Sequence, residues 1–352
     1  MSRYVIDSRR SVSARAIGGF KILPLVVSHR RFHRRSKQRL VLQNSSTEVN
    51  TAAVIYDALE SRYGREQCGR VLDSLQFSAA GQEYTRFHPG KGLQKASSYI
   101  AGLTAEPFHD LDAEHFLWMR NLEKNSSVIR DEIADALKNT ELSTLGNHIW
   151  AAAAREEAIA YGPDWKTLVL QDRCIWEETN CKLFPKTVEL VKAANVPSVE
   201  VFFARQDPST GIKPHTDNTN FILTSHLGLD VPEGECWMQV GEFKKEWSNG
   251  RGMIADTSFI HSTANESDSQ TRYVLIIRFW HPELSSSEKY ALQFLFDALE
   301  DPSSYGIANC VRRADDREPG TKSNVRGSGS RRSDKRRRNS SQGLGLLAKG
   351  MK

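Results

Sequence analysis

Five short runs of β-branched and aromatic residues, all C-terminal to Pro197, constrain the fold most strongly. They read SVEVFFAR, NFILTSHLGL, CWMQVGEF, GMIADTSF and RYVLIIRFW, and clusters of Gly, Pro, Asn and Asp separate them. Runs of this length and composition are typical of β-strands. Their spacing predicts antiparallel strands in a jelly-roll or cupin-like double sheet.

The chain before these runs has helical periodicity. Apolar residues recur at helical spacing from Thr47 to Leu75, with a break at Gly64, and again over residues 113–138. Residues 185–194 form a further expected helix with proline in its first turn. Helices followed by strands predict an α+β fold in which N-terminal helices brace the double sheet.

The net charge of +5 conceals three regions of different charge. Residues 1–45 carry +10 and residues 311–352 carry +9, which leaves −14 for residues 46–310. The basic balance therefore belongs to two tails, which we expect to be disordered, and nucleic acid is not expected as a partner of the acidic core. Five cysteines without a CxxC pair argue against a disulfide framework and a structural zinc site.

The N-terminal tail has the Arg- and Ser-rich, acid-poor composition of an organelle transit peptide, for a chloroplast or a mitochondrion. A secretory signal is less favoured because Lys21 and Pro24 interrupt the apolar stretch. The remaining alternative is a basic tail without targeting value, which would leave the protein cytoplasmic or nuclear. No apolar run reaches the length of a membrane span.

A His-x-Asp motif and a distant histidine form the sharpest local feature. His215 and Asp217 are two residues apart, so on an extended segment they project to the same face. His261 follows 46 residues after His215, at the end of another expected strand. Two imidazoles and one carboxylate make the facial triad of iron(II) oxygenases, which leaves three positions of an octahedral ion open. The alternative is a solvent-exposed tripeptide without a metal.

Arg272 is a candidate anchor for a dicarboxylate. It begins the run RYVLIIRFW, where alternation places it on one face with Val274, Ile276, Arg278 and Trp280. An inward guanidinium binds a carboxylate through two parallel hydrogen bonds, which lysine cannot reproduce. A surface ion pair is the alternative for Arg272. Arg278 competes for the same role, but we expect it to lie farther from the metal.

His226, in the run TSHLGL, has two interpretations. A histidine within a strand is commonly a hydrogen-bonded core residue. The alternative is contact with the metal-proximal carboxylate of a cosubstrate. Thr224, in the same run, is assigned with His226 and Arg272 to the cosubstrate site.

Residues 211–284 resemble the catalytic domain of the aspartyl/asparaginyl β-hydroxylase family. The segments GIKPHTDNTN, SHLGLDVPEG, GMIADTSFIHS and RYVLIIRFWHPEL carry the resemblance, in family order and at family-like spacing. Weaker similarity extends it to about residues 95–285. The resemblance implies a double-stranded β-helix that uses Fe(II), 2-oxoglutarate and O2 to hydroxylate an amino-acid side chain. Asp or Asn in a peptide or protein is the foremost substrate, with a free amino acid or peptidyl proline as alternatives.

Carried over by position, the resemblance implies that His215 and His261 bind iron. Arg272 would bind the distal carboxylate of 2-oxoglutarate, and His226 would lie by its metal end. The chain then divides into a basic extension (1–45), a helical region (46–94), an oxygenase domain of the hydroxylase type (95–300) and a basic tail (311–352).

The sequence departs from the pattern of the animal enzymes at three places. Asp217 stands where they have glycine, which adds a carboxylate to their two-histidine site. Their arginines between TN and HLGL are replaced by residues 221–225, FILTS, and a serine that helps to hold 2-oxoglutarate aligns with Ala204. These changes leave the substrate open.

Two other classes of function compete with the dioxygenase. A metal-binding cupin without oxygenase activity would have no role for Arg272. A nucleic-acid-associated protein would use the basic run RRSDKRRRN at residues 331–339, which also suits a nuclear signal or a solvated tail. The run has no interleaved aromatic residues for base stacking.

Overall fold

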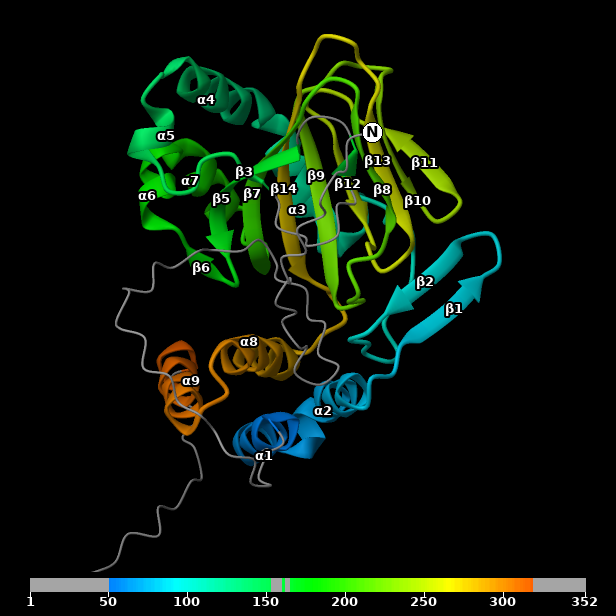
Figure 1. Ribbon diagram of the computed structural model, residues 1–352, viewed down its shortest axis with the longest axis vertical. Helices are drawn as coiled ribbons and strands as arrows, with labels where there is room; N and C mark the ends of the chain where they lie inside the picture. Colours follow the sequence, from blue (N-terminus) through cyan, green and yellow to red (C-terminus); the bar gives the residue numbers. More distant parts are fainter. Residues whose placement is uncertain (1–50, 153–159, 162–164, 319–352) are drawn as a thin grey trace, which may run out of the picture.

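Two antiparallel sheets face each other at the centre of the protein, which was analysed as a computed structural model that describes residues 51–152, 160–161 and 165–318 (Figure 1). The larger sheet has the order β12-β9-β14-β7-β5-β3, with β6 paired to β5, and the smaller has the order β11-β10-β13-β8-β4. The strands of the larger sheet are β3 (Ala151–Ala152), β5 (Trp165–Asp172), β6 (Ile175–Trp176), β7 (Ser198–Gln206), β9 (Ile222–Asp230), β12 (Gly252–Ala255) and β14 (Arg272–Trp280). Those of the smaller sheet are β4 (Ala160–Tyr161), β8 (Thr210–His215), β10 (Cys236–Val240), β11 (Phe243–Glu246) and β13 (His261–Asn265).

The space between the sheets is an apolar core built by strand alternation. Val274 and Ile276 of β14 face inward, where they pack with Phe202 of β7 and Met238 of β10. The intervening residues of β14, such as Leu275, lie on the opposite face of the larger sheet. The jelly-roll double sheet predicted from the five runs is therefore confirmed. GMIADTSF departs from the prediction because it is a strand only as far as Ala255.

Helices cover the outer face of the larger sheet. The buried side chains of α4 and α7 pack against the outward residues of β5, β7, β9 and β14, so this layer is the one that braces the sheet. The elements around it are η1 (Glu114–Phe116), α3 (Leu117–Lys124), α4 (Ser126–Lys138), α5 (Leu142–Leu145), α6 (Glu178–Leu183) and α7 (Pro185–Ala193). The helices predicted over 113–138 and 185–194 are confirmed, the first in three pieces and the second with Pro185 at its start.

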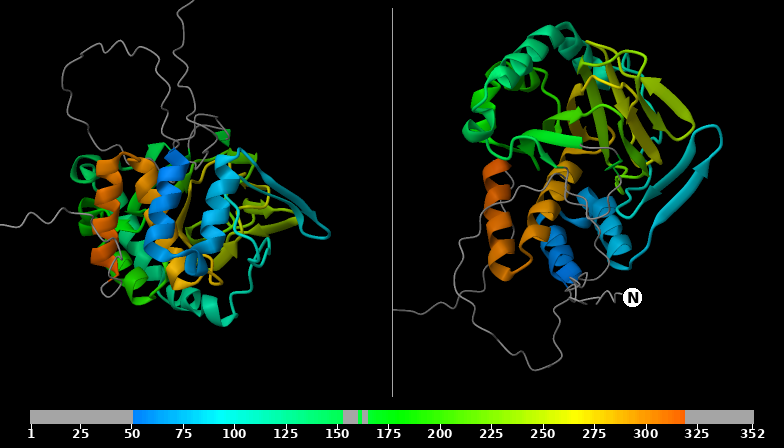
Figure 2. Two further views of the ribbon diagram at one scale, coloured as in Figure 1. Left: turned by 90° about the horizontal axis from the view of Figure 1, so that it is seen from below. Right: turned by 45° about the horizontal axis from the view of Figure 1, so that its top comes forward.

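Four helices form a second layer below one end of the double sheet: α1 (Thr51–Tyr63), α2 (Arg65–Ala79), α8 (Ser286–Glu300) and α9 (Ser304–Arg317). Figure 2 shows them side by side, so the first and last described helices share one apolar cluster. The break at Gly64, with φ of +72°, is confirmed. Helix α9 corrects one boundary, because residues 311–317 belong to this layer. The N-terminal extension, with the predicted transit peptide, and residues 319–352 lie outside the described residues.

The hairpin of β1 (Tyr84–His88) and β2 (Gly92–Ala96) was not predicted, because few of its residues are large and apolar. It reaches the double sheet through the loop before β13, where Ile260 donates its backbone N–H to Leu93 O at 2.9 Å and Lys95 donates to Ser258 O at 2.9 Å. The hairpin therefore holds the loop that leads into His261. Within the described part of the chain, no helix has the length and apolarity to cross a membrane.

Candidate metal centre

Two strands of the smaller sheet bring the distant histidines together. His215 is the last residue of β8 and His261 the first of β13, and the antiparallel register pairs them directly. Their ring centroids are 4.1 Å apart. Asp217 lies two residues beyond β8, and one ligand atom from each of the three residues falls within 4.8 Å of the others. The three residues predicted from the His-x-Asp motif and His261 therefore converge on one point.

Each histidine is oriented by its own strand. His215 Nδ1 lies 2.8 Å from Lys213 O, and His261 Nδ1 lies 3.0 Å from Phe259 O. A carbonyl oxygen only accepts, so Nδ1 carries the proton and the lone pair is on Nε2. This tautomer is the one that binds a divalent ion, and a hydrogen bond on the other ring nitrogen is the usual way to fix it. His261 is buried and His215 is slightly more exposed.

Asp217 is held at the backbone and faces the histidines through one oxygen. Its N–H donates to Thr257 O at 2.9 Å, which ties the loop after β8 to the loop before β13. Its Oδ1 lies 3.8 Å from His215 Nε2, too far for a hydrogen bond and suited to an ion between them. Two imidazoles and a carboxylate on one side of such an ion fit the facial triad of iron(II).

Arg272 lies inside the double sheet with its charge uncompensated by any acid of the described residues. The residue is 2 % exposed, its guanidinium carbon lies 4.1 Å above the centroid of the Trp247 ring, and its Nε and Nη1 atoms have no hydrogen-bond partner. Burial lowers the pKa of the guanidinium to about 10. An unpaired buried charge is costly, so this geometry calls for an anion beside the guanidinium.

His226 lies nearer the candidate metal centre than Arg272, on the adjacent strand β9, where it pairs with Ile276 of β14. Its ring is 6 % exposed, it stands 5.6 Å from the Trp247 ring, and neither of its nitrogens has a hydrogen-bond partner. Burial, with the nearby charge of Arg272 as the second cause, lowers its pKa to about 3, so the ring is neutral near pH 7. The interpretation of His226 as a hydrogen-bonded core residue is therefore wrong.

A sequence profile of the aspartyl/asparaginyl beta-hydroxylase family matches residues 123–282, which include the triad, Arg272 and His226. This segment belongs to that family. The matched segment begins later than the resemblance at residues 95–285 and ends at nearly the same place.

The hydroxylase segment is similar to two human proteins of the same kind. Aspartyl/asparaginyl beta-hydroxylase is 27% identical over 59% of this chain, which spans only 27% of that relative's length. Aspartate beta-hydroxylase domain-containing protein 2 is 30% identical over 38% of each chain. Among solved structures, a Pseudomonas putida prolyl-4-hydroxylase has a TM-score of 0.30 and 13% identity, covering 44% of this chain and 87% of that one.

Thr224 lies at the end of the double sheet that carries the candidate metal centre. It pairs across the sheet with Arg278 of β14 and with Ala255 of β12, and its hydroxyl is 3.3 Å from the Thr257 hydroxyl. Ala204 faces the interior beside Val274. Neither residue supplies the cation or the serine hydroxyl that the family pattern has at these places.

Arg278 corrects the expectation that it lies farther from the metal than Arg272. Its Nη2 atom is 3.4 Å from Asp217 Oδ2, whereas Arg272 is six residues away along the same strand face, about 20 Å at the rise of a β-strand. Trp280, assigned to this face too, packs among the helices below the sheet instead. The register of β14 with β7 shifts between Arg278 and Phe279, which ends the simple alternation.

Four neighbours of the candidate site residues were missed from the sequence: Glu200, Gln206, Trp247 and Asp256. Glu200 and Asp256 are carboxylates at 1 % exposure near the metal, and burial raises the pKa of each to about 7. Gln206 pairs with Arg272 across the sheet. An acid inside the apolar run SVEVFFAR was a usable signal for Glu200, whereas nothing local distinguishes Trp247.

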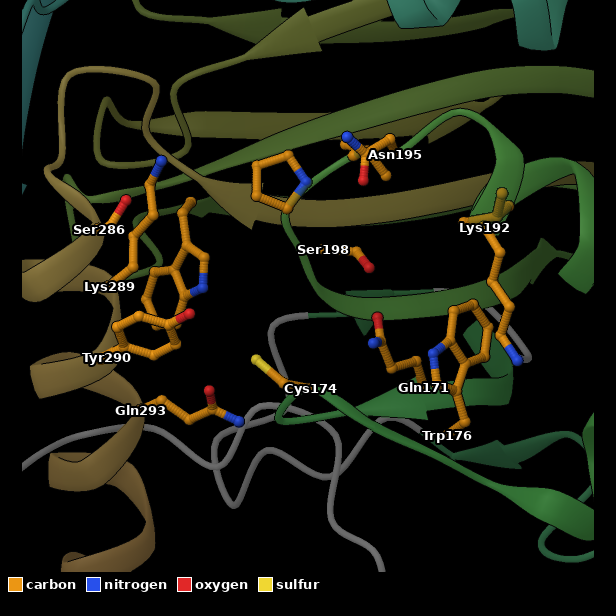
Figure 3. A pocket seen from close by; sticks show the side chains of 14 residues that line it. Gln171, Cys174, Trp176, Lys192, Asn195, Ser198, Ser286, Lys289, Tyr290 and Gln293 are labelled. Carbon is orange, nitrogen blue, oxygen red and sulfur yellow. The ribbon is translucent and has the colours of Figure 1, made fainter. Parts of the chain in front are cut away.

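A separate pocket of about 410 Å³ lies outside the double sheet, between α7, α8 and the β5–β6 turn (Figure 3). Cys174 and Ser198 point into it, while the amine of Lys192 lies 4.8 Å over the Trp176 ring. Its lining contains neither an imidazole nor a carboxylate. This pocket therefore lacks the imidazole and carboxylate donors that a facial triad of iron(II) needs.

Proposed function

We propose that the protein is an iron(II)- and 2-oxoglutarate-dependent dioxygenase that hydroxylates an amino-acid side chain. The observation that carries the proposal is the pairing of a His-Asp-His triad with a buried guanidinium that has no acidic partner among the described residues. A metal-binding cupin without this chemistry has no use for the second feature. The match to the hydroxylase family supports the proposal. The chain spans only 27% of the length of the human aspartyl/asparaginyl beta-hydroxylase, so the activity itself is proposed.

The metal would be held by His215 Nε2, His261 Nε2 and a carboxylate oxygen of Asp217. The donor set fits iron(II), which accepts imidazole nitrogen and carboxylate oxygen together. When bound, iron(II) supplies the activation of O2, coupled to conversion of 2-oxoglutarate to succinate and CO2 and to oxidation of a substrate C–H bond. The carbonyls of Lys213 and Phe259 fix the ligand tautomers before the ion arrives.

Arg272 and His226 would bind the cosubstrate. The unpartnered Nε and Nη1 atoms of Arg272 leave donors on two edges of the guanidinium for the distal carboxylate, and the guanidinium carbon lies 4.1 Å over the Trp247 ring centroid. His226, neutral and nearer the triad, would donate one N–H to the metal-proximal carboxylate. The apolar residues between them, such as Phe202 and Ile276, exclude water from the chain of the dicarboxylate.

The substrate of the proposed reaction is the side chain of an amino acid, with Asp or Asn in a peptide or protein first and a free amino acid or peptidyl proline as alternatives. The family membership supports the first of these. The acidic charge of residues 46–310 and the loss of the family's arginines at residues 221–225 favour testing all three.

Oxygen-initiated turnover tests the proposal directly. The protein is incubated anaerobically with iron(II) and 2-oxoglutarate, oxygen is admitted, and succinate is measured with a panel of Asp-, Asn- and Pro-containing peptides and free amino acids. We expect succinate release that depends on both iron and oxygen and that rises with the true substrate. Absence of succinate under all these conditions, in protein shown to bind iron(II), would leave the cupin alternative.

A further inference from the structure

Arg278 occupies the space between the candidate metal centre and a second buried carboxylate. Its Nη2 atom lies 3.4 Å from Asp217 Oδ2, and its Nη1 atom lies 3.4 Å from Glu200 Oε2. The side chains of Arg278 and Asp217 are each 12 % exposed and that of Glu200 is 1 % exposed. These three residues form a line from the metal centre into the larger sheet, here called the Asp217–Arg278–Glu200 chain.

The two oxygens of Asp217 face different groups. Oδ1 is the atom 3.8 Å from His215 Nε2, and Oδ2 is the atom that faces Arg278. A guanidinium on Oδ2 stops the carboxylate from turning that oxygen to the ion. The geometry therefore favours a single metal bond through Oδ1, which keeps the remaining positions of the ion open for cosubstrate and oxygen.

Glu200 explains why Arg278 stays in this position. The strands pair Arg278 directly with Glu200 on β7 and with Thr224 on β9, so the guanidinium sits over a cross-strand acid on one side and a short hydroxyl on the other. Within the described residues Arg278 is the ion-pair partner of Glu200, whose two oxygens have no hydrogen bond. Keeping this carboxylate charged without a hydrogen bond is costly, and the adjacent Arg278 cation offsets part of that cost.

We infer that Arg278 is a positioning residue for the iron ligand Asp217, and that Glu200 holds Arg278 in place. The inference rests on the proposed metal centre and goes beyond it, because it assigns roles to two residues outside the triad. Arg278 then serves the metal, and the distal carboxylate of the cosubstrate is left to Arg272. A carboxylate at position 217 is useful as a ligand only with this guanidinium behind it.

Cobalt(II) binding to the anaerobic full-length protein tests the inference without turnover. Iron(II) affinity is measured in parallel by competition with a chelator, and the visible cobalt bands report the number and kind of ligands. We expect Arg278→Gln to weaken both ions by about 10- to 100-fold and to change the cobalt bands, as loss of a group that orients a ligand does. Arg278→Lys, which keeps the charge without the fork, should restore part of the affinity.

Glu200→Gln is the second variant, because it preserves shape and removes the charge that holds Arg278. We expect a smaller loss, about 3- to 10-fold, with a cobalt spectrum shifted toward that of Arg278→Gln. The matched control is Arg205→Gln, an arginine of the same strand β7 that faces away from the core and pairs with Asp207 at 3.1 Å. Its affinities and spectrum should equal those of the wild type.

A double-mutant cycle decides whether Arg278 acts through Asp217. In an Asp217→Gly background, Arg278→Gln should cause no further loss of metal affinity, whereas a general structural effect would add to that of Asp217→Gly. Wild-type affinity and bands in Arg278→Gln, or additive losses in the cycle, overturn the inference while the triad stands. Failure of the wild-type protein to bind either ion overturns the metal centre and the inference together, so the two failures are distinguishable.

Discussion

Two arginines on the inward face of one strand have opposite electrostatic surroundings. Arg272, at the start of β14, is fully buried over Trp247 and has no acidic partner among the described residues. Arg278, six residues later, lies between Asp217 and Glu200. The strand that carries both is the same, so the difference comes from the neighbouring strands. An unpaired buried cation indicates a missing anion, and a paired one indicates a structural or orienting task.

The comparison assigns the two ends of the interior to different partners. The end at Arg272 has donors without partners, namely its Nε and Nη1 atoms, and the single N–H of neutral His226 also lacks one. The end at Arg278 has acceptors in excess, since Asp217 and Glu200 share one guanidinium and the two triad histidines have their lone pairs on Nε2. A dicarboxylate suits the first end and a divalent cation suits the second.

Removing a triad histidine should have the largest effect, because it takes a ligand from the proposed metal centre and leaves the end at Arg272 intact. We expect His215→Ala and His261→Ala each to reduce succinate formation by at least about 100-fold while the protein remains folded by circular dichroism. His115→Ala, an exposed histidine of η1, is the control and should retain turnover. Normal turnover in either triad variant would remove the metal assignment.

Arg272→Ala should have the second largest effect, and this effect should fall on 2-oxoglutarate binding and not on iron binding. A buried charge-assisted pair is worth about 2–5 kcal/mol, so we expect 2-oxoglutarate binding to weaken by about 30- to 4,000-fold. Arg272→Lys should recover little of this, because the ammonium cannot form the fork. Iron affinity, measured on the same samples, should change less than threefold or so. A collapse of iron affinity with unchanged 2-oxoglutarate binding would make Arg272 a structural residue.

Asp217→Gly tests whether the carboxylate is a ligand, since the animal relatives have glycine at this position. We expect about 10- to 100-fold weaker iron binding and loss of most turnover, with 2-oxoglutarate still recognised by Arg272. Asp217→Asn keeps the size of the side chain and removes its charge. Its iron affinity should lie between that of Asp217→Gly and that of the wild type. Unchanged iron affinity in Asp217→Gly would show that two histidines suffice.

The smallest expected effect is on the pH dependence of stability. Burial raises the pKa of Asp256 to about 7, above its usual value near 3.8, although Ser258 and Gln94 donate hydrogen bonds to it. Between these values the folded protein binds the extra proton, so stability falls as pH rises, by up to about 1.4 kcal/mol per pH unit. Asp256→Asn should remove the Asp256 contribution to this slope in urea unfolding of the metal-free protein from pH 5 to 7, leaving that of Glu200, whose pKa burial also raises to about 7. An identical slope in both proteins would place the titration elsewhere.

The sequence predicted the parts of the site that depend on local chain geometry. His215 and Asp217 share a face because they are two residues apart, and Arg272 points inward because strands alternate. The position of Arg278 could not be predicted, because its distance from Asp217 depends on the registers of β7, β9 and β14 together. The same reason hides Trp247, which meets Arg272 only across the interior.

The double sheet and three helical regions were predictable from periodicity, whereas two other elements were not. The hairpin of β1 and β2 is mostly polar, and backbone hydrogen bonds with Ser258 and Ile260 fix its position. Helix α9 has many charged residues, and only Cys310, Ala314 and Gly306 of its length are buried. With so few apolar residues, the composition of α9 is similar to that of the tail that follows it, and no helix was predicted there.

The carbonyl bonds to Nδ1 of His215 and His261 also bear on which ion the protein acquires in a cell. The backbone carbonyls orient both histidines without an ion. A site formed in advance in this way selects poorly between iron(II) and other divalent ions. For nitrogen and oxygen donors, cobalt, nickel, copper and zinc all bind more tightly than iron(II) at equal concentration. Correct loading would then depend on the supply of free metals in the compartment. Zinc is therefore a natural competitive inhibitor of such a centre, and overexpressed protein is expected to emerge mismetallated unless iron is supplied in excess.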